Sequence, residues 1–421
     1  MHRWLLILAL TVCPGLVQAT TFHVAQSGGS DGNSCSAAQN ANTAKLTIGA
    51  GIGCLSGGDT LIIHAGTYPE QIHDHTIPSG SSGAPTIVKG NGNPAQGTGE
   101  RAIIRTPPLG GYQSVMATSG HDIMIDGLVL DGINNKNVVL EFAGGPNLTL
   151  QNSEIMNMGP IPNDGNGAAC VDLVVEGGNN RVIHNKIHDC QNSGDDPNGL
   201  STHCIYTHGN NNTVDGNEIF NCGNHGIQQF NNPGSGITSN GNTFKNNRIY
   251  NCAARGILLS SGDNNIAYNN IIYNSGFNKP GGGRGALACT DGNNNQFYNN
   301  TVYGNLVGLR AGPQGPNGTV FRNNIVFNNN TDFQTDGSNG TVDDHNLLGV
   351  NPLFVNAGAG DFHVQSNSPA SNAGVAVSIV TTDFDGNTRG NPPELGAFEI
   401  GGAPPQPPTP LPPPVNLRLV P

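Results

Sequence analysis

The densest group of acid and base side chains in the sequence lies at residues 201–208, Ser-Thr-His-Cys-Ile-Tyr-Thr-His. The imidazoles of His203 and His208 can exchange protons near neutral pH, and the phenol of Tyr206 can donate or accept one. His225 adds a further imidazole a short distance along the chain. Because general acid and base catalysis needs such groups side by side, we predict His203, Tyr206 and His225 as catalytic residues.

Two columns of residues appear when four apolar positions are aligned as successive turns of one repeat; these positions are Ile205, Ile227, Ile257 and Ala286. The residues two positions earlier are basic: His203, His225, Arg255 and Arg284. The residues one position later should face outward, because side chains alternate along a strand. With Val171 and Leu309 added to the aligned positions, they are Asp172, Tyr206, Gln228, Leu258, Leu287 and Arg310, with His208 following on the same face.

A row of like charges is unfavourable unless solvent or an anionic partner compensates for it. The basic column therefore predicts a groove for a polyanion, such as a polymer of uronic acids. We predict that this substrate is bound by Asp172, His208, Gln228, Arg255, Arg284 and Arg310. The alternative is that each basic residue only ends a strand at a solvated corner. The formal net charge of −12 argues against nucleic acid as a partner.

A sequence repeat indicates the elements that position these residues. The phrase Asn-x-(Ile, Val or Leu) recurs every 22 to 32 residues, and its asparagines are Asn185, Asn217, Asn247, Asn270, Asn300, Asn324 and Asn346. Each repeat holds two short apolar segments separated by Asn and Gly, which accept the left-handed backbone of a sharp corner. Strands this short pair best with the same strand one turn later, so we predict an all-β solenoid, a parallel β-helix. We expect the asparagines to form an inward ladder and Cys190, Cys222 and Cys252 to be small core residues.

The chain divides into five predicted segments: a signal peptide at 1–19, an N-terminal cap at 20–58, the β-helix at 59–350, a C-terminal closing segment at 351–400 and a proline-rich tail at 401–421. The first segment has Arg3, an apolar run and small residues before a cut after Ala19. No later stretch approaches about 18 apolar residues, so we expect no membrane span. Secretion permits disulfides, and we predict one between Cys35 and Cys54. We expect a secreted or periplasmic monomer.

Three stretches of this sequence resemble a known family. They are Gly58 to Tyr68 (GDTLIIHAGTY), the Asn-x-Ile coils, and the closing NPLF at 351–354 with LGAFE at 395–399. They look like the bacterial right-handed parallel β-helix repeat proteins, a superfamily with pectate, alginate and chondroitin lyases and mannuronan C5-epimerases. The resemblance covers nearly all of residues 21–400. It implies a right-handed parallel β-helix that acts on an extended, uronate-containing polysaccharide by β-elimination or C5-epimerisation.

Both reactions need a group that neutralises the uronate carboxylate and a base for the adjacent proton. Arg255 or Arg284 could neutralise the carboxylate, and His225 or His203 could take the proton. Tyr206 could return a proton to the leaving oxygen. Several lyases of this superfamily also use calcium, for which Asp195 and Asp196 are the candidate ligands, with a solvated loop as the alternative. No other cofactor is expected.

Two departures from the active members of the superfamily leave other functions open. The aligned face has no lysine to serve as a lyase base, and the Asp-Pro-His-Asp phrase of the epimerases is absent. One alternative is a non-catalytic protein of the cell surface that binds glycans or serves as a rigid rod. A lesser alternative is a glycoside hydrolase of the polygalacturonase type, suggested by Gly-Asp-Asp at 194–196 and Asn-His-Gly at 224–226.

Overall fold

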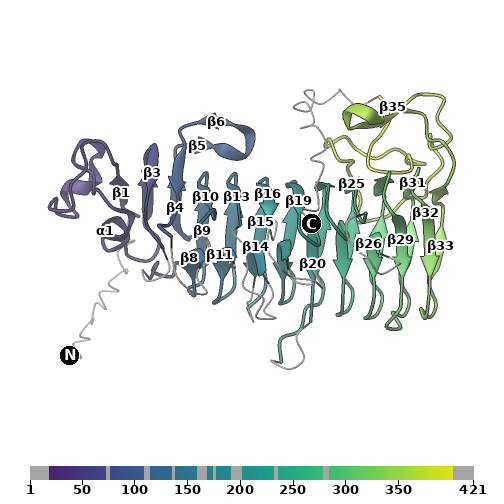
Figure 1. Cartoon of the computed structure of the whole chain (residues 1–421), viewed down its shortest axis with the longest axis horizontal. Coiled ribbons are helices and arrows are strands. Elements are labelled where there is room, and N and C mark those ends of the chain that lie inside the picture. The colour runs from purple at the N-terminus through teal and green to yellow at the C-terminus, as the bar shows by residue number, and fades with distance from the viewer. Residues whose placement is uncertain are drawn as a thin grey trace, which may run out of the picture.

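The computed structural model describes residues 19–72, 76–108, 114–134, 138–158, 168–173, 177–190, 202–231, 236–277 and 284–401. These residues form a parallel β-helix, in which short strands stack into three long sheets along one axis (Figure 1). Almost all of the predicted signal peptide and of the proline-rich tail lies outside the described residues. None of the helices in the described ranges is long or apolar enough to cross a membrane.

Each full coil passes through the first, second and third sheet in turn, and every strand pairs in parallel with its counterpart in the next coil. The first sheet contains β1 (Thr21–Val24), β2 (Thr60–Ile63), β4 (Thr86–Gly90), β9 (Ile123–Asp126), β12 (Leu148–Gln151), β15 (Arg181–Ile183), β18 (Thr213–Asp215), β21 (Thr243–Lys245), β24 (Ile266–Tyr268), β27 (Gln296–Tyr298), β30 (Val320–Arg322) and β33 (Val342–Asp344).

The second sheet contains β3 (Gly66–Tyr68), β7 (Ala102–Ile104), β10 (Val129–Asp131), β13 (Glu154–Met156), β16 (Lys186–Cys190), β19 (Glu218–Cys222), β22 (Arg248–Tyr250), β25 (Ile271–Tyr273), β28 (Thr301–Tyr303), β31 (Ile325–Phe327) and β34 (Leu347–Leu348). The third sheet contains β8 (Ser114–Thr118), β11 (Val138–Phe142), β14 (Ala168–Leu173), β17 (Thr202–Thr207), β20 (Ile227–Gln229), β23 (Ile257–Leu259), β26 (Gly285–Cys289), β29 (Val307–Ala311) and β32 (Thr331–Thr335). Two antiparallel pairs lie outside these sheets, β5 (Gly92–Asn93) with β6 (Thr98–Gly99), and β35 (Phe354–Asn356) with β36 (Asp361–Val364).

The core is made of apolar side chains that stack in register from coil to coil. In the second sheet Ile187, Ile219, Ile249, Ile272, Val302 and Val326 are in register and fully buried. Burying one such side chain contributes roughly 1.5–3 kcal/mol. Because every coil adds a similar layer, the fold is stabilised evenly along its length.

The predicted asparagine ladder is confirmed. At each corner between the first and second sheets, a residue with positive φ precedes the ladder asparagine, as Asn246 (φ 53°) precedes Asn247. The Nδ2 of Asn247 donates to Oδ1 of Asn270 at 3.0 Å and to the Val214 carbonyl at 3.0 Å. The same amide contact joins each member to the next in the series Asn185, Asn217, Asn247, Asn270, Asn300, Asn324 and Asn346. The amides satisfy buried backbone groups at the corners, where no sheet hydrogen bonds are available.

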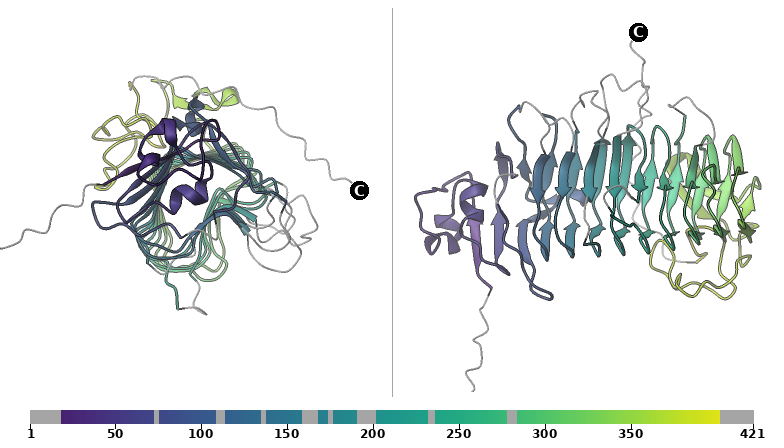
Figure 2. Two further views of the ribbon diagram at one scale, coloured as in Figure 1. Left: turned by 90° about the vertical axis from the view of Figure 1, so that its left-hand side faces the viewer. Right: turned by 90° about the horizontal axis from the view of Figure 1, so that it is seen from below.

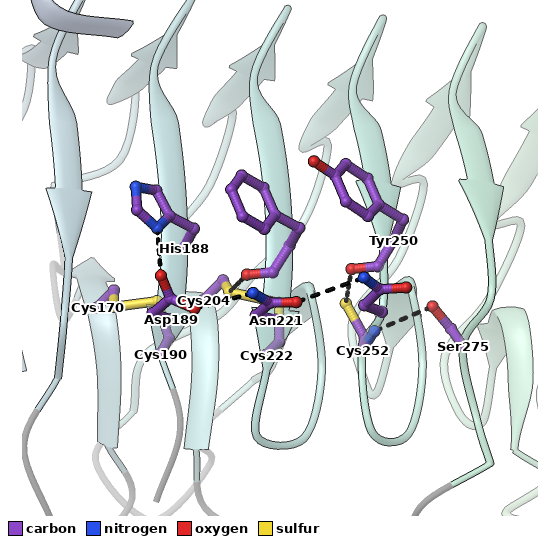
Figure 3. The surroundings of a disulfide bond; sticks show 12 residues. Cys170, His188, Asp189, Cys190, Cys204, Asn221, Cys222, Tyr250, Cys252 and Ser275 are labelled. Carbon is purple, nitrogen blue, oxygen red and sulfur yellow. Dashed lines mark hydrogen bonds and ion pairs between the residues drawn. A yellow bond between two sulfur atoms is a disulfide. The ribbon is translucent and has the colours of Figure 1, made fainter. Parts of the chain in front are cut away.

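Three disulfides lie inside the described chain. Cys35 is bonded to Cys54 near the N-terminal end. Cys170 is bonded to Cys190 and Cys204 to Cys222, each pair joining the third sheet to the second sheet of the following coil (Figure 3). The expectation that Cys190 and Cys222 are only small core residues is therefore wrong. Both point inward beside a second cysteine, with Cα atoms 5.7 and 5.6 Å apart, which suits a disulfide.

Cys252 occupies the next position of the same column and is a free, buried thiol (Figure 3). The third-sheet position that faces it, on the preceding coil, is Gly226, where the coil before has Cys204, so no cysteine is opposite to it. Burial raises the pKa of the Cys252 thiol to about 12. For Cys252, the expected role as a small core residue is confirmed.

The first coil is closed by α1 (Ile48–Ile52), which packs its buried residues Ile48 and Ile52 against the interior (Figure 2). Thr47 caps this helix by accepting a hydrogen bond from the Ala50 amide at 3.2 Å. Short 3-10 helices at Ala37–Gln39 and Ala41–Thr43 lie beside it, and two others are at Pro94–Gln96 and Ala357–Ala359. The helix covers apolar side chains that the first coil would otherwise expose to water.

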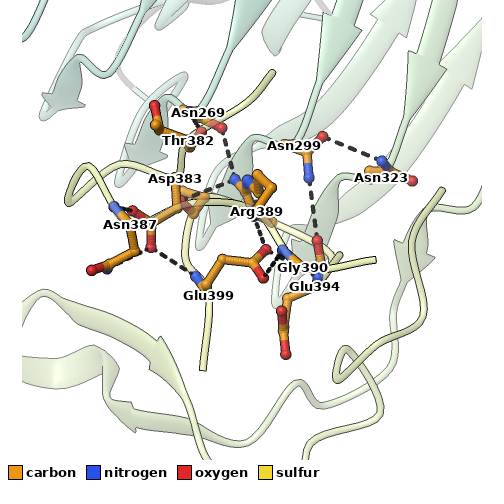
Figure 4. Close-up of polar contacts among 12 residues, drawn as sticks. Asn269, Asn299, Asn323, Thr382, Asp383, Asn387, Arg389, Gly390, Glu394 and Glu399 are labelled. Carbon is orange, nitrogen blue, oxygen red and sulfur yellow. Dashed lines mark hydrogen bonds and ion pairs between the residues drawn. The ribbon is translucent and has the colours of Figure 1, made fainter. Parts of the chain in front are cut away.

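Residues 351–401 leave the helix end and return along the outer face of the second sheet (Figure 1). Phe362 of β36 packs on the ring of Tyr273, with centroids 5.1 Å apart. Arg389 forms a buried ion pair with Glu399 at 2.8 Å and donates to Oδ1 of Asn269 at 2.7 Å (Figure 4). This segment covers part of the second sheet, and the predicted site residues lie on the third sheet.

Candidate functional site

The outer face of the third sheet holds two polar rows that run along the helix axis. Ile205, Ile227 and Ile257 are in register and point into the core. The next residue in each strand therefore faces outward, which places Asp172, Tyr206 and Gln228 in one row. The predicted alignment of these coils is confirmed by the strand pairing.

The alignment fails by one residue at β26. The strand pairing places Leu287, not Ala286, opposite Ile257, so Leu287 fills the core and Ala288 takes the outward position. Two positions before Leu287, where Arg255 and His225 stand in the earlier coils, the chain has Gly285. Arg284 lies one residue before this position and is therefore out of register with the basic column. The sequence offers two adjacent apolar residues here, and the larger one fills the space between Ile257 and Leu309.

His203 and His225 stack on neighbouring coils of the basic column. Their ring centroids are 5.1 Å apart with the planes inclined by 14°. Nη1 of Arg255, on the next coil, lies 3.4 Å from Nε2 of His225, so the guanidinium donates to the imidazole. Both histidines are more than nine-tenths buried, and Nδ1 of His203 has no hydrogen-bond partner among the described residues. The three residues form a continuous row with one charged end.

The pKa of His203 falls to about 3, because the ring is buried and the Arg255 charge and His208 disfavour a second cation. His203 is therefore neutral at physiological pH. A neutral imidazole can accept a proton or donate a hydrogen bond, but a site in this state adds no positive charge. His203 therefore contributes no positive charge to the column.

Tyr206 lies at the centre of a ring cluster. Its ring is 5.0 Å from His203, 4.5 Å edge-on from His208 and 6.2 Å from Phe230. Burial and the neighbouring Asp172 raise the pKa of the Tyr206 phenol. Burial also lowers the pKa of His208, against an opposing hydrogen bond with the Phe230 backbone. The phenol therefore keeps its proton at neutral pH, as a general acid must.

Asp172 is flanked along its row by Glu141 on β11 and Tyr206 on β17. Burial and the Glu141 carboxylate raise the pKa of Asp172 to about 8. Its Oδ1 atom has no hydrogen-bond partner among the described residues. Asp172 is therefore a mostly protonated carboxylic acid at neutral pH, beside the phenol of Tyr206.

The guanidinium of Arg255 is the cation closest to the imidazoles. Burial, with repulsion from Arg284 and Arg310, lowers the pKa of Arg255 to about 9. Arg310 pairs with Asp336 through two hydrogen bonds of 3.1 and 2.7 Å. No carboxylate within the described ranges forms an ion pair with Arg255. A partly buried cation without a carboxylate partner favours an anionic ligand.

The structure thus brings together most of the predicted site residues: Asp172, His203, Tyr206, His208, His225, Gln228 and Arg255. Gln228 donates to the Ser260 hydroxyl at 3.2 Å. Arg310 lies three coils beyond Gln228 and has its own carboxylate. Asp195 and Asp196 lie outside the described residues. Across the rest of the chain that is described, no three His, Cys, Asp or Glu residues are grouped as a metal site would need.

The sequence analysis missed Glu141 and Phe230. A signal for Glu141 was present, because Asn152-Ser-Glu-Ile has Ser153 where the later coils have a ladder asparagine. The backbone N–H of Ser153 donates to Asn185 Oδ1 at 3.0 Å. Accepting Ser at this position extends the repeat to the coil of β14, and Glu141 lies one coil earlier, where Val-Val-Leu-Glu-Phe at 138–142 pairs in register with β14. Phe230 follows β20 and shows no such pattern.

A solenoid with an axial row of polar side chains on one sheet defines the class of parallel β-helix proteins with a side-face site. The family model for the right-handed β-helix region matches residues 115–302 and 239–391, and the chain belongs to this family. The fold is therefore the right-handed form that the resemblance predicted. No match is found among curated proteins.

Solved structures share the fold at low sequence identity. The structure of pectate lyase Pel9A is 17% identical, with a TM-score of 0.63, and the match covers 91% of this chain and 97% of that one. A GH136 lacto-N-biosidase from Eubacterium ramulus is 10% identical with a TM-score of 0.42, covering 79% and 68% of the two chains. The periplasmic alginate epimerase AlgG is 12% identical with a TM-score of 0.37, covering 69% and 61%. At this identity the match to pectate lyase Pel9A establishes the fold alone.

Proposed function

We propose that this protein is an exported, monomeric enzyme that binds an extended anionic polysaccharide across β14 to β23 and acts on it by β-elimination or C5-epimerisation. The observation that supports this most is the row of His203, His225 and Arg255, two buried imidazoles that end at a partly buried cation without a carboxylate partner among the described residues. Such a site can hold a uronate carboxylate and accept the proton beside it. The three disulfides suit an oxidising compartment.

In this proposal Arg255, assisted by Arg284, holds the uronate carboxylate. His225 takes the proton from C5, because it is the imidazole nearest to the guanidinium. For β-elimination the C4–O bond breaks as the C4–C5 double bond forms, and Tyr206 protonates the leaving oxygen. For epimerisation the proton returns to C5 on the opposite face. The raised pKa of the Tyr206 phenol keeps it protonated for either step.

The test is to incubate the purified protein with alginate, pectate and glycosaminoglycans, with and without calcium, and to follow the ultraviolet absorbance of unsaturated uronates. Epimerisation is followed by the exchange of deuterium from solvent into C5. Replacing His225 by Gln should reduce either rate by about 10²–10⁴. Replacing Arg255 by Gln should weaken polymer binding by about tenfold to a hundredfold.

Arg322→Gln is the matched control, since Arg322 pairs with Asp344 on the first sheet and should leave both properties unchanged. If the wild type catalyses no reaction and His225→Gln still binds the polymer, the protein is not an enzyme of this kind. The remaining interpretation is then a non-catalytic glycan-binding protein. New reducing ends without an absorbance change would indicate a hydrolase instead.

A further inference from the structure

The polar side chains on the outer face of the third sheet differ in charge between its two ends. Glu141 and Asp172 lie on adjacent coils toward the N-terminal end, and Arg255 lies just before β23, three coils beyond Asp172. At about 4.8 Å per coil, the guanidinium is roughly 14 Å from Asp172 and roughly 19 Å from Glu141 along the axis. A polymer that runs along the sheet therefore presents different sugar rings to the two ends.

The acidic end has no basic partner within the described chain. Neither Glu141 nor Asp172 takes part in an ion pair there. Asp172 is 8% exposed, and its Oδ1 has no hydrogen-bond partner among the described residues. A ligand carboxylate placed against this pair would meet a like charge without compensation, in a partly desolvated position.

A neutral sugar ring meets no such penalty. Its hydroxyl or amide groups can donate to the Glu141 carboxylate, and its hydroxyl, amide or ester oxygens can accept from the protonated Asp172. A buried polar group left unpaired in the free protein gains a partner when such a ring binds. The acidic pair thus weakens binding of a charged ring and strengthens binding of a neutral one. Both effects increase the preference for the neutral ring, and specific interfaces commonly combine them.

We infer that Glu141 and Asp172 select the substrate, so that the site takes a polysaccharide in which a uronate at Arg255 is joined, toward the β11 end, to uncharged units. This inference rests on the proposed function, because it uses Arg255 as the carboxylate site. It names a narrower substrate class, a polymer in which uronates are interrupted by neutral or esterified sugars. A continuous polyuronate would place a carboxylate against the acidic pair.

The experiment compares polymers that differ only in charge. Pectate is measured against the same backbone with about half of its carboxylates methyl-esterified, and unsulfated chondroitin serves as a strictly alternating polymer. Affinity and initial rate are measured for the wild type, Glu141→Gln and the double variant Glu141→Gln with Asp172→Asn. Glu100→Gln is the control, since this exposed carboxylate precedes β7 of the second sheet and its ion pair within the described residues is with His64.

The wild type and Glu100→Gln should prefer the esterified or alternating polymer, and Glu141→Gln should bind the fully charged polymer about tenfold more tightly than the wild type does. A wild-type preference for the fully charged polymer, unchanged in Glu141→Gln, would overturn the inference while leaving the proposed function intact. Undiminished binding of all polymers by Arg255→Gln would overturn the proposed function itself, and the inference with it. Because Glu141 is half-exposed, the single variant should fold even if the double variant does not.

Discussion

The imidazole of His203 stacks on that of His225 at 5.1 Å, and the far edge of His225 faces the guanidinium of Arg255 at 3.4 Å. Protonation of His203 would add a second cation to a row that already carries Arg255, and burial of the ring opposes it as well. The pKa of His203 is therefore lowered, and this ring stays neutral at physiological pH. The free energy of unfolding of the protein should therefore depend on pH.

We predict that the folded protein loses stability as the pH falls from about 6.5 towards 3. The pKa of His203 is near 3 when folded and returns to its ordinary value near 6.5 when unfolded. The unfolded state then binds more protons over this range, so the free energy of unfolding falls by up to about 1.4 kcal/mol per pH unit for this group. Denaturant unfolding at several pH values should show a shallower slope for His203→Gln. The control His121→Gln removes an exposed imidazole and should leave the slope unchanged; a His203 resonance that titrates near pH 6.5 would refute the prediction.

We predict the opposite pH dependence for His363 in the closing segment. Burial alone would lower its pKa, but hydrogen bonds to Asp385 at 2.8 Å and Asp361 at 2.6 Å outweigh it and raise the pKa. The stabilisation is complete below pH 6.5 and is lost as the pH rises through the folded pKa. His363→Gln should cost about 1–2 kcal/mol of unfolding free energy at pH 6 and less at pH 9. An equal cost at both values would show that the charge contributes nothing.

We predict that one ladder asparagine contributes several times more to the free energy of unfolding than an exposed asparagine does. Asn247 is fully buried, and its amide accepts from the Asn217 backbone at 3.1 Å while donating to Asn270 and Val214. Asn247→Ala leaves these groups without partners and should lower the free energy of unfolding by about 3 kcal/mol. Asn317→Ala, at an exposed position, should change it by less than about 0.5 kcal/mol. Both variants are compared by thermal or denaturant unfolding. If they lose similar amounts of unfolding free energy, the ladder is not a source of stability.

We predict that the closing segment detaches when its buried ion pair is broken. Arg389 donates to Glu399, to Asn269 and to the Gly396 carbonyl (Figure 4). Arg389→Met leaves the Glu399 carboxylate buried without its cation, at a cost of about 3–5 kcal/mol. Limited proteolysis should then cut within 351–400 while the β-helix stays intact. Adding Glu399→Gln to Arg389→Met removes the unpaired charge and should recover part of the lost unfolding free energy. If the double variant loses as much as the two single variants added together, the two residues are not coupled.

The repeat of the sequence was sufficient for the fold because a solenoid is built from local rules. The asparagine before Ile219 or Ile249 marks a corner, and the apolar residue marks an inward side chain, whichever coil is considered. The one-residue error at β26 arose where Ala286 and Leu287 are both apolar, so that the pattern alone does not choose between them. The backbone pairing of Leu287 with Ile257 and Leu309 makes the choice.

The disulfides show a different limit. Cys190, Cys222 and Cys252 have the same place in three successive coils, and the sequence treats them alike. Only the first two meet a second cysteine from the third sheet, at Cys170 and Cys204. This pairing depends on which residues the bends of the third sheet bring to the interior, and the second-sheet repeat does not encode it.

The sequence by itself determined that the chain forms a parallel β-helix, where its asparagine ladder lies and which coils bring the candidate site residues together, since these follow from the period and alternation of side chains. Only the tertiary structure decided the chemical state of these residues. The spacing of His203, His225 and Arg255 does not reveal that both imidazoles are buried and that of His203 neutral, or that Asp172 is protonated beside Glu141. Burial and the charges of neighbouring coils set those pKa values, and both depend on how the coils stack in space.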